Sequence, residues 1–370
     1  MKRLFRIACI LGALALVVAF SVLAWLTPQY PDSEKSALGN CDGYGSFFYS
    51  TSEINACPRI TGYYDVPTRP DSTTAMFAGS PRLHPVSWAT TILHKRHAID
   101  DPEQAQEMRE YLETLLLHAH ITPRGNLVYP YLFDFSYDYE MSPWYSPMAQ
   151  GLAGAAFMAG WRVFGDERYF DAAIKSIESI RAEGDHYAFY RITQNGVWLQ
   201  EYPHSPYAVL DGSLIAVIGI HDVWKSLPGQ HPLKPIYKDL WQAALQGVKD
   251  EWQRFKAPYG IYFEDSKRRV TPEYYTINMA ALRYLGVIDP AVEDIRKQLI
   301  MPEGWLPRYA ATVSGAFFKI TRAWWPHVPL GQEVTRETLP DFAKFSYAGS
   351  AHTRQELVAQ RPCPRATETP

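Results

Sequence analysis

The chain has 370 residues, of which 47% are hydrophobic and 20% charged, and its formal net charge at pH 7 is −3. This composition excludes an intrinsically disordered protein, because the chain can bury a large apolar core in one big or two ordinary domains. The small net charge also excludes a global attraction for polyanions, so we expect no nucleic-acid partner, and an acidic substrate would need local cations.

The chain opens on an apolar run at residues 7–26, which follows three basic residues. A helix of this length crosses a hydrocarbon core of about 30 Å, and the basic flank predicts a cytoplasmic N-terminus. The run exceeds a usual signal-peptide core of about 7 to 15 residues, although residues 22–24 offer a weak cleavage site. We therefore expect a membrane anchor at 1–29 with the remainder extracytoplasmic. The absence of N-glycosylation sequons favours a bacterial periplasm.

Four cysteines are present, and Cys41 and Cys57 flank a short segment that a disulfide could close in an oxidising compartment. Whether they pair stays open. The cysteines are far apart, and the 11 histidines contain no pair with zinc-ligand spacing near a third ligand. We therefore expect no metal and no cofactor.

Residues 30–80 are rich in Pro, Ser, Gly, Asp and Tyr without a sustained hydrophobic period, which predicts an irregular lead-in. Helical patterns begin near His84 and continue across a predicted domain at 81–330. One helix starts at Asp101-Pro102, where an N-cap residue precedes a proline, and its apolar residues then recur at spacings of three and four.

After an aromatic segment at 127–139, predicted to be an extended loop or short hairpin, a helix is expected at about 148–163. Small residues line this helix, so we assign Gly151 and Gly154 to close helix packing rather than to function. Gly165-Asp166 ends this helix and caps the next. Further helices are predicted at about 209–224, 237–255, 276–285 and 290–299.

Helix hairpins joined by long aromatic loops predict an all-α fold, an incomplete α/α toroid of paired inner and outer helices with short β-hairpins or extended loops. No regular repeat of 34 or 40 residues is present, which disfavours a stacked-repeat solenoid. Residues 301–326 fit a packed helix better than a second membrane-surface element, and residues 331–370 are predicted to be a polar tail.

The stretch from Asn195 to Gly212 brings Glu201 and Tyr202 out of an apolar, strand-like run. Two prolines then remove backbone donors and disfavour helix before them, so the segment is an extended approach to a helix start. From the residues alone, two interpretations are equally open: Glu201 and Tyr202 serve function, or Glu201 is merely solvated and Tyr202 is a core aromatic. Upstream, residues 143–151 read Pro-Trp-Tyr-Ser-Pro-Met-Ala-Gln-Gly.

These two stretches closely resemble the C-terminal domain of the D-glucuronyl C5-epimerases, which convert glucuronate to iduronate within heparan-type chains. The resemblance covers roughly residues 80 to 290. It implies an isomerase that inverts C5 of D-glucuronate residues in a polysaccharide, as heparosan-N-sulfate-glucuronate 5-epimerases do. Inversion needs two acid/base groups on opposite faces of the sugar and neutralisation of the substrate carboxylate, but neither metal nor redox cofactor.

The resemblance also implies the site residues, with Glu201, Tyr262 and Tyr274 as the catalytic groups. Asp211 stands where the family usually has asparagine, and Asn278 stands where it has a histidine. Arg268 belongs to a basic run that fits either a partner for the uronate carboxylate or a solvated turn. The implied substrate-binding residues are Trp144, Tyr145, Gln150, Tyr202, Asp211, Arg268 and Asn278.

Two other functions stay open. A uronate polysaccharide lyase would form the same C5 carbanion and then expel the C4 substituent, which shortens the chain and leaves an unsaturated sugar. A membrane-anchored glycan-binding protein would keep the fold without turnover. The expected partners are a glucuronate-containing polysaccharide and the membrane, and a homodimer is left open because the separate β-rich region of the family is missing from this chain.

Overall fold

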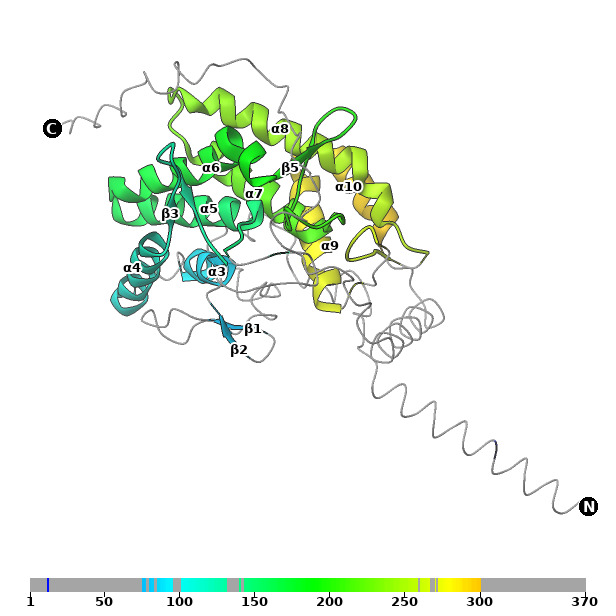
Figure 1. Cartoon of the computed structure of the whole chain (residues 1–370), viewed down its shortest axis with the longest axis horizontal. Coiled ribbons are helices and arrows are strands. Elements are labelled where there is room, and N and C mark those ends of the chain that lie inside the picture. Colours follow the sequence, from blue (N-terminus) through cyan, green and yellow to red (C-terminus); the bar gives the residue numbers. More distant parts are fainter. Residues whose placement is uncertain are drawn as a thin grey trace, which may run out of the picture.

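The computed structural model describes residues 12, 75–77, 80–82, 85–95, 101–131, 140, 143–258, 260–266, 270 and 272–300 (Figure 1). The predicted anchor, most of the lead-in, the Cys41 and Cys57 pair, the basic run at 267–269 and the predicted tail lie outside the described residues. Among the described helices, none combines the length and apolar character needed to cross a membrane.

The described part of the chain is mostly helical, which confirms the predicted helical class. Its α-helices are α3 (Pro85–Lys95), α4 (Pro102–Leu117), α5 (Pro147–Phe164), α6 (Glu167–Tyr187), α7 (Leu210–Ser226), α8 (Leu233–Glu251), α9 (Pro272–Ile288) and α10 (Pro290–Leu299). A 3₁₀ turn, η5 (Trp252–Phe255), follows α8. Three two-stranded antiparallel hairpins pair β1 (Ala75–Phe77) with β2 (Ser80–Arg82), β3 (His120–Ile121) with β4 (Leu127–Val128), and β5 (Tyr190–Ile192) with β6 (Val197–Leu199).

Side-chain caps mark the starts of α4, α5, α6 and α10. Asp101, Ser146, Asp166 and Asp289 each accept a hydrogen bond from a backbone N–H in the first turn of the helix that follows. Each of these bonds satisfies a donor that has no partner within the helix. At the other end of α5, Gly165 adopts a left-handed conformation with φ of 66°, which ends the helix as glycine commonly does.

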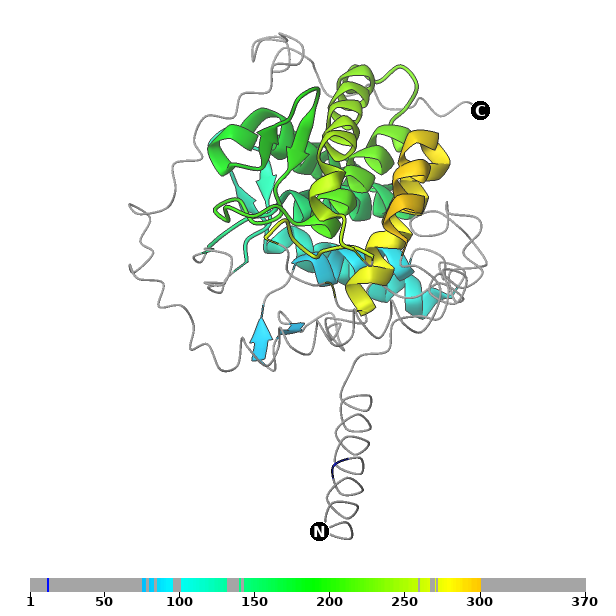
Figure 2. The ribbon, with the colours of Figure 1, turned by 90° about the vertical axis from the view of Figure 1, so that its right-hand side faces the viewer.

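The helices fall into two kinds by burial. Most residues of α5 and α7 are buried, 13 of 18 and 14 of 17, whereas α6 and α8 bury one face and expose the other. A helix that is buried all round must lie inside the fold, and an amphipathic helix covers it. In Figure 2, α8 and the α9–α10 pair stand side by side, and both α8 and α9 pack against α7.

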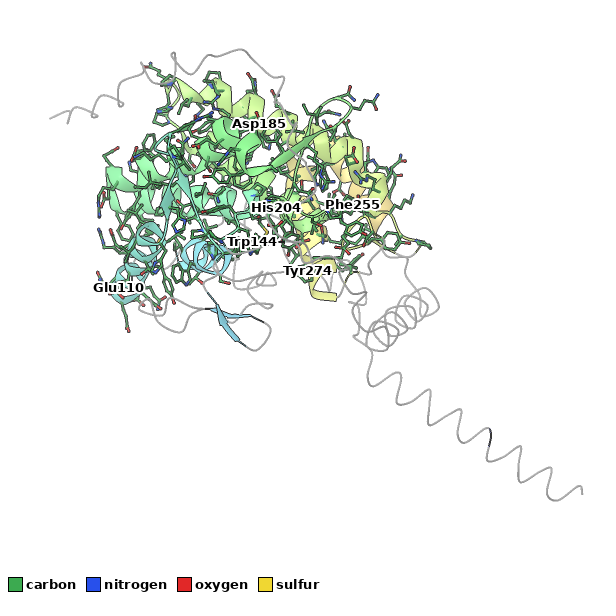
Figure 3. The ribbon with its side chains drawn as sticks, viewed as in Figure 1. Glu110, Trp144, Asp185, His204, Phe255 and Tyr274 are labelled. Atoms are coloured by element: carbon green, nitrogen blue, oxygen red, sulfur yellow. The ribbon has the colours of Figure 1, made fainter. Side chains whose placement is uncertain are left out.

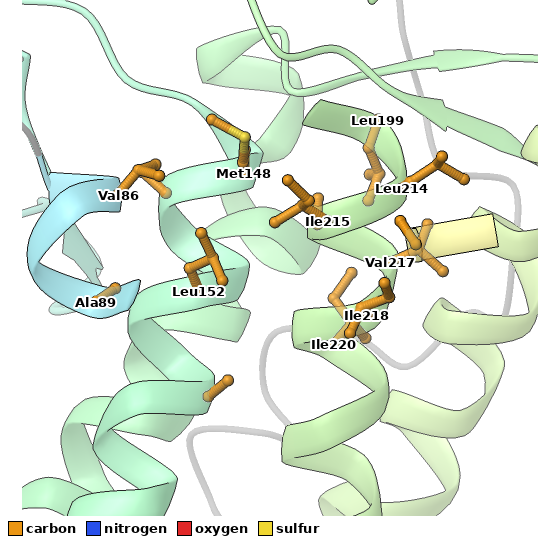
Figure 4. Close-up of a cluster of buried hydrophobic side chains, with 14 of the residues drawn as sticks. Val86, Ala89, Met148, Leu152, Leu199, Leu214, Ile215, Val217, Ile218 and Ile220 are labelled. Carbon is orange, nitrogen blue, oxygen red and sulfur yellow. The ribbon is translucent and has the colours of Figure 1, made fainter. Parts of the chain in front are cut away.

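Close contacts show that the inner helices run in the same direction. Gly151 of α5 lies against Ala216 of α7, and Gly154 one turn later lies against Val223. Figure 4 shows Val86 of α3 level with Met148 and, one turn further along both helices, Ala89 level with Leu152. The two inner neighbours of α5 are therefore parallel to it, which places the N-terminal ends of α3, α5 and α7 at the same end of the domain.

Helix α9 follows the same direction as α7. The hydroxyl of Tyr284, late in α9, donates to the Asp222 carboxylate late in α7 at 2.8 Å, while Tyr274 at the start of α9 packs near the start of α7 through Phe263. Helix α6 runs opposite to α5, because Gly154 and Gly160 of α5 contact Ile177 and Tyr169 of α6 in reverse order.

The connections at the two ends of the inner helices differ. Short turns join α5 to α6, α7 to α8 and α9 to α10, whereas long stretches lead into α5, α7 and α9. All of the predicted catalytic residues lie in or directly after these long stretches. The fold therefore gathers them at the N-terminal ends of the inner helices.

Candidate functional site

The loop between β6 and α7 is held in place by Gln200. The amide nitrogen of this buried side chain lies 3.1 Å from the carbonyl oxygen of Tyr202, 3.2 Å from that of Ser205 and 2.6 Å from that of Tyr207. Three backbone carbonyl groups of the loop therefore point toward the Gln200 side chain. Such fixation positions Glu201 and its neighbours before any ligand binds.

Arg191 of β5 adds a second clamp on the same loop. Its guanidinium donates to the carbonyl oxygens of Ser205 at 2.6 Å and Pro206 at 3.2 Å. Burial lowers the pKa of the Arg191 guanidinium from its ordinary value. The prolines at this turn supply no N–H donors, so the loop depends on these side-chain bonds to its carbonyl groups.

Glu201 precedes α7 in the chain and packs against its first turn at Gly212, so that only 4% of the Glu201 surface is exposed. A Cβ atom at Gly212 would lie 2.1 Å from Oε2 of Glu201 and 2.5 Å from its Cβ. Gly212 therefore provides the space that the glutamate occupies. The carboxyl group lies beside the N-terminus of α7, the end of a helix that carries positive partial charge. The alternative of a solvated Glu201 is wrong.

A second loop, between η5 and α9, docks on the residues just before Gly212. The Leu210 N–H donates to the Phe263 carbonyl oxygen at 3.3 Å, and Val209 forms a β-bridge with Glu264. This contact supplies a backbone acceptor at the start of α7, where no described side chain caps the helix.

Tyr262 and Tyr274 reach this region from the second loop and from α9. The backbone N–H of Tyr262 donates to the Phe255 carbonyl oxygen at 2.7 Å, and the Tyr274 ring meets the Phe263 ring edge-on at 4.7 Å between centroids. Both tyrosines are partly exposed. The structure thus brings segments bearing all three predicted catalytic residues together around the N-terminal end of α7.

Aromatic residues that precede α5 pack against the first loop. Trp144 stacks on Tyr131 with ring centroids 3.8 Å apart and planes 5° apart, and its ring centroid lies 5.6 Å from that of Tyr202. Figure 3 shows Trp144, His204 and Tyr274 in the same part of the view. Trp144 and Tyr202 are buried, whereas Tyr145 is partly exposed and its hydroxyl lies 3.0 Å from Nδ1 of His120. Of these predicted sugar contacts, Tyr145 is the one with substantial exposure.

Two predicted substrate-binding residues make contacts within the protein. Gln150 is fully buried, and its amide fits between the Leu127 carbonyl oxygen and the Tyr129 N–H, each at 3.2 Å, so that it attaches α5 to β4. Asn278 is also fully buried, and its Nδ2 donates to the Tyr274 carbonyl oxygen at 2.8 Å. A contact of either residue with a sugar stays a prediction.

The two remaining predicted substrate contacts are Asp211 and Arg268. Asp211 is buried in the first turn of α7, one residue before Gly212. Arg268 lies outside the described residues, so its predicted contact with a carboxylate stays a prediction.

The site contains a carboxylate and histidine pair that the sequence motifs did not reveal. Glu140 is fully buried. Its Oε1 accepts from the backbone N–H of His204 at 2.8 Å, and its Oε2 lies at hydrogen-bond distance, 2.8 Å, from Nδ1 of the same histidine. Burial raises the pKa of the Glu140 carboxyl above its ordinary value, although the His204 hydrogen bonds oppose the shift. The partners are 64 residues apart in sequence, and no spacing rule links them.

In the described part of the chain, no three His, Cys, Asp or Glu side chains are arranged to hold a metal ion. The candidate residues themselves carry carboxyl, phenol, imidazole and amide groups.

Comparison with known proteins confirms the resemblance seen in the sequence. A family model described as "D-glucuronyl C5-epimerase C-terminus" matches residues 125–299. The matched segment contains α5 to α10 and both loops that bear the candidate residues. No curated protein matches the chain in sequence.

Similarity to solved structures is weak. Cellobiose 2-epimerase from Bacillus thermoamylovorans B4167 has a TM-score of 0.45 and 12% sequence identity, with 67% of this chain and 68% of that chain covered. Unsaturated glucuronyl hydrolase from Bacillus sp. GL1 has a TM-score of 0.36 and 14% identity, with 55% of this chain and 59% of that chain covered. These scores support no conclusion about the activity of this chain.

Proposed function

We propose that this chain, whose residues 125–299 match the C-terminal domain of the D-glucuronyl C5-epimerases, inverts C5 of D-glucuronate residues to L-iduronate within a polysaccharide. The observation that carries the proposal is the buried Glu201 carboxylate on Gly212, at the helix end where the segments bearing Tyr262 and Tyr274 also meet. This arrangement joins a carboxylate and two phenols within one family-matched segment.

In the proposed reaction Glu201 removes the C5 proton from one face of the glucuronate ring. The electron pair of the broken C5–H bond moves into the adjacent carboxylate, which forms an enediolate. Tyr274 then gives its phenolic proton to C5 from the opposite face, and Tyr262 holds and polarises the uronate. The protonated Glu201 and the deprotonated Tyr274 must exchange protons with solvent before the next turnover in the same direction.

The proposed substrate suits the electrostatics of this end of the domain. Uronates are anions, and the enediolate carries more negative charge near C6 than the ground state does. The N-terminal ends of α5 and α7 lie together there, and helix N-termini stabilise nearby negative charge by about 0.3 to 1 kcal/mol each at exposed sites. A site with such fixed dipoles stabilises a developing anion without reorganising.

We extend the proposal to the architecture and the location of the protein. The parallel inner helices and their antiparallel outer partners suit an arc of an α/α toroid, with the substrate binding at the end where the long loops gather. Residues 1–29 would anchor the chain in a membrane and leave this domain extracytoplasmic. A homodimer stays a prediction, which the mass of the purified chain in solution checks.

Incubation of the purified chain with glucuronate-containing polysaccharides in deuterated water tests the function. We expect deuterium at C5 and the appearance of iduronate, because the returned proton comes from a group that exchanges with solvent. A lyase would instead yield an unsaturated sugar that absorbs in the ultraviolet, together with shorter chains. A glycan-binding protein would show binding without either product, and that result would refute the proposed activity.

Substitution of Gly212 by alanine should lower the epimerisation rate by about 10²-fold or more, the usual contribution of one positioned acid/base group. The added methyl would occupy the space of the Glu201 carboxylate, whose Oε2 lies 2.1 Å from the Cβ position, so the glutamate must turn away. Initial rates of C5 exchange measure the effect. The matched control is Gly229→Ala, because a Cβ there meets no atom within 4 Å. Equal rates for the two variants would contradict the assigned role of Glu201.

A further inference from the structure

The Glu140 and His204 pair has a geometry that leaves one ring nitrogen of the histidine available. Glu140 binds the backbone N–H of His204 through Oε1 and the ring Nδ1 through Oε2. Two bonds from one buried carboxyl group fix both the backbone and the ring plane of His204. The remaining nitrogen, Nε2, makes no hydrogen bond to another described residue, and 35% of the His204 side chain is exposed.

The position of His204 ties it to the candidate site. It lies three residues after Glu201, in the loop that Gln200 and Arg191 clamp through its carbonyl groups. The neighbouring residue, Ser205, donates its backbone N–H to the Tyr202 carbonyl oxygen at 3.1 Å. His204 is therefore a rigidly mounted imidazole on the same short turn as the proposed base.

The other described cationic side chains in the loops that lead into α7 and α9 are engaged elsewhere. Arg191 donates to two carbonyl groups of its own loop, and Arg254 pairs with Glu251 and Asp265. Lys256 places its ammonium group 5.7 Å from the Trp252 ring centroid. Among the described residues of these loops, His204 therefore offers a ring nitrogen, Nε2, that has no hydrogen bond to another described residue.

We propose that His204 binds the carboxylate of the uronate through Nε2–H and is a further catalytic residue, an inference that rests on the proposed epimerase function. The proposed contact uses the imidazolium form of the ring, which donates from Nδ1 toward Glu140 and from Nε2 toward the uronate. A charge-assisted hydrogen bond of this kind is stronger than a neutral one. Glu140 is then a positioning residue, because it acts through His204.

The chemical role follows from where charge moves in the reaction. When Glu201 takes the C5 proton, the electron pair of the C5–H bond forms a C5–C6 double bond and the carboxylate becomes an enediolate. Nε2–H of His204 donates to one enediolate oxygen while charge accumulates there, and no proton needs to be transferred to complete the cycle. An interaction that strengthens as charge develops lowers the barrier as well as the dissociation constant.

Substitution of His204 by asparagine provides the test. The asparagine amide can still donate toward Glu140 from near the Nδ1 position, but it has no group at the Nε2 position. Calorimetry measures the binding of a glucuronate-containing oligosaccharide and of its methyl ester, which lacks the negative charge. We expect the wild-type chain to bind the acid more tightly than the ester. In His204→Asn the ratio of the two dissociation constants should fall by about 10- to 100-fold, because binding of the acid weakens. The ester should bind equally to both chains.

A second variant, His204→Gln, separates loss of the Nε2 contact from a loss of stability. His204→Gln has a longer side chain that can place an N–H near the Nε2 position, so it should retain more of the preference for the acid than His204→Asn does. Thermal unfolding of both variants should stay close to that of the wild-type chain. If His204→Asn keeps the full preference for the acid, or if both variants weaken acid and ester equally, the inference is overturned.

The same measurements separate this inference from the proposed function. Wild-type C5 exchange together with an unchanged acid preference in His204→Asn overturns the role of His204 alone. A wild-type chain that exchanges no C5 hydrogen overturns the epimerase function and this inference together.

Discussion

Replacement of Glu201 by glutamine should lower the rate of C5 inversion by about 10²- to 10⁴-fold while polysaccharide binding stays largely intact. Glutamine has nearly the same shape, so it fits the space over Gly212, but its amide cannot accept the C5 proton. Replacement of Tyr274 by phenylalanine should produce a loss of the same order, since it removes the group that returns a proton from the other face.

The two variants should fail in different ways. With one group disabled, the intact face can still exchange the C5 hydrogen even though inversion stops. Deuterium exchange measured separately on glucuronate and iduronate substrates would show this asymmetry. Glu103→Gln, on the exposed surface of α4, is the control for a general effect of lost charge. Full epimerisation by both Glu201→Gln and Tyr274→Phe would remove the two-base mechanism.

Substitution of Gly219 by alanine should cause a large loss of stability, about 3 kcal/mol in the free energy of unfolding, near the upper end of the range for an overpacked core. Its Cβ would lie 2.3 Å from the carbonyl carbon of Gly151 and 2.4 Å from the carbonyl oxygen. Both atoms belong to the backbone of α5, so the two inner helices would have to separate. The gain of about 1 kcal/mol from replacing glycine in a helix is too small to offset this.

Urea unfolding followed by circular dichroism measures this change. Gly229→Ala is again the control, because open space surrounds its Cβ position. A stability of Gly219→Ala within about 0.5 kcal/mol of the wild-type value, the usual range for a surface substitution, would mean that α5 and α7 do not pack as closely as described.

Local signals in the sequence predicted the helices well where caps were strong. The expected helix at about 148–163 is α5 at 147–164, and the assignment of Gly151 to close packing is confirmed by its contact with Ala216. The start of α9 was predicted too late in the chain. Helix α9 begins at Pro272, four residues before the predicted start, because proline suits the first turn and needs no partner for an N–H.

The candidate site could be predicted only in part, because its motifs identify residues but not their surroundings. Glu201 was found from a family motif, but its burial depends on Gly212 and on the position of α7. Gln150 belongs to the same kind of motif, yet it serves the attachment of α5 to β4. The Glu140 and His204 pair has no sequence signal, since its two members meet only after separate loops have packed.

The difference between the two ends of the inner helices has a consequence for how such a protein can diversify. Short turns at one end keep the hairpins in register, while the long segments at the other end carry the reactive side chains. Changes of length or composition in those segments leave the helix contacts around Gly151 and Gly219 untouched. A new sugar specificity could therefore arise by exchange of a single entry segment, and grafting one such segment between related chains would transfer a preference for a glycan without rebuilding the helical scaffold.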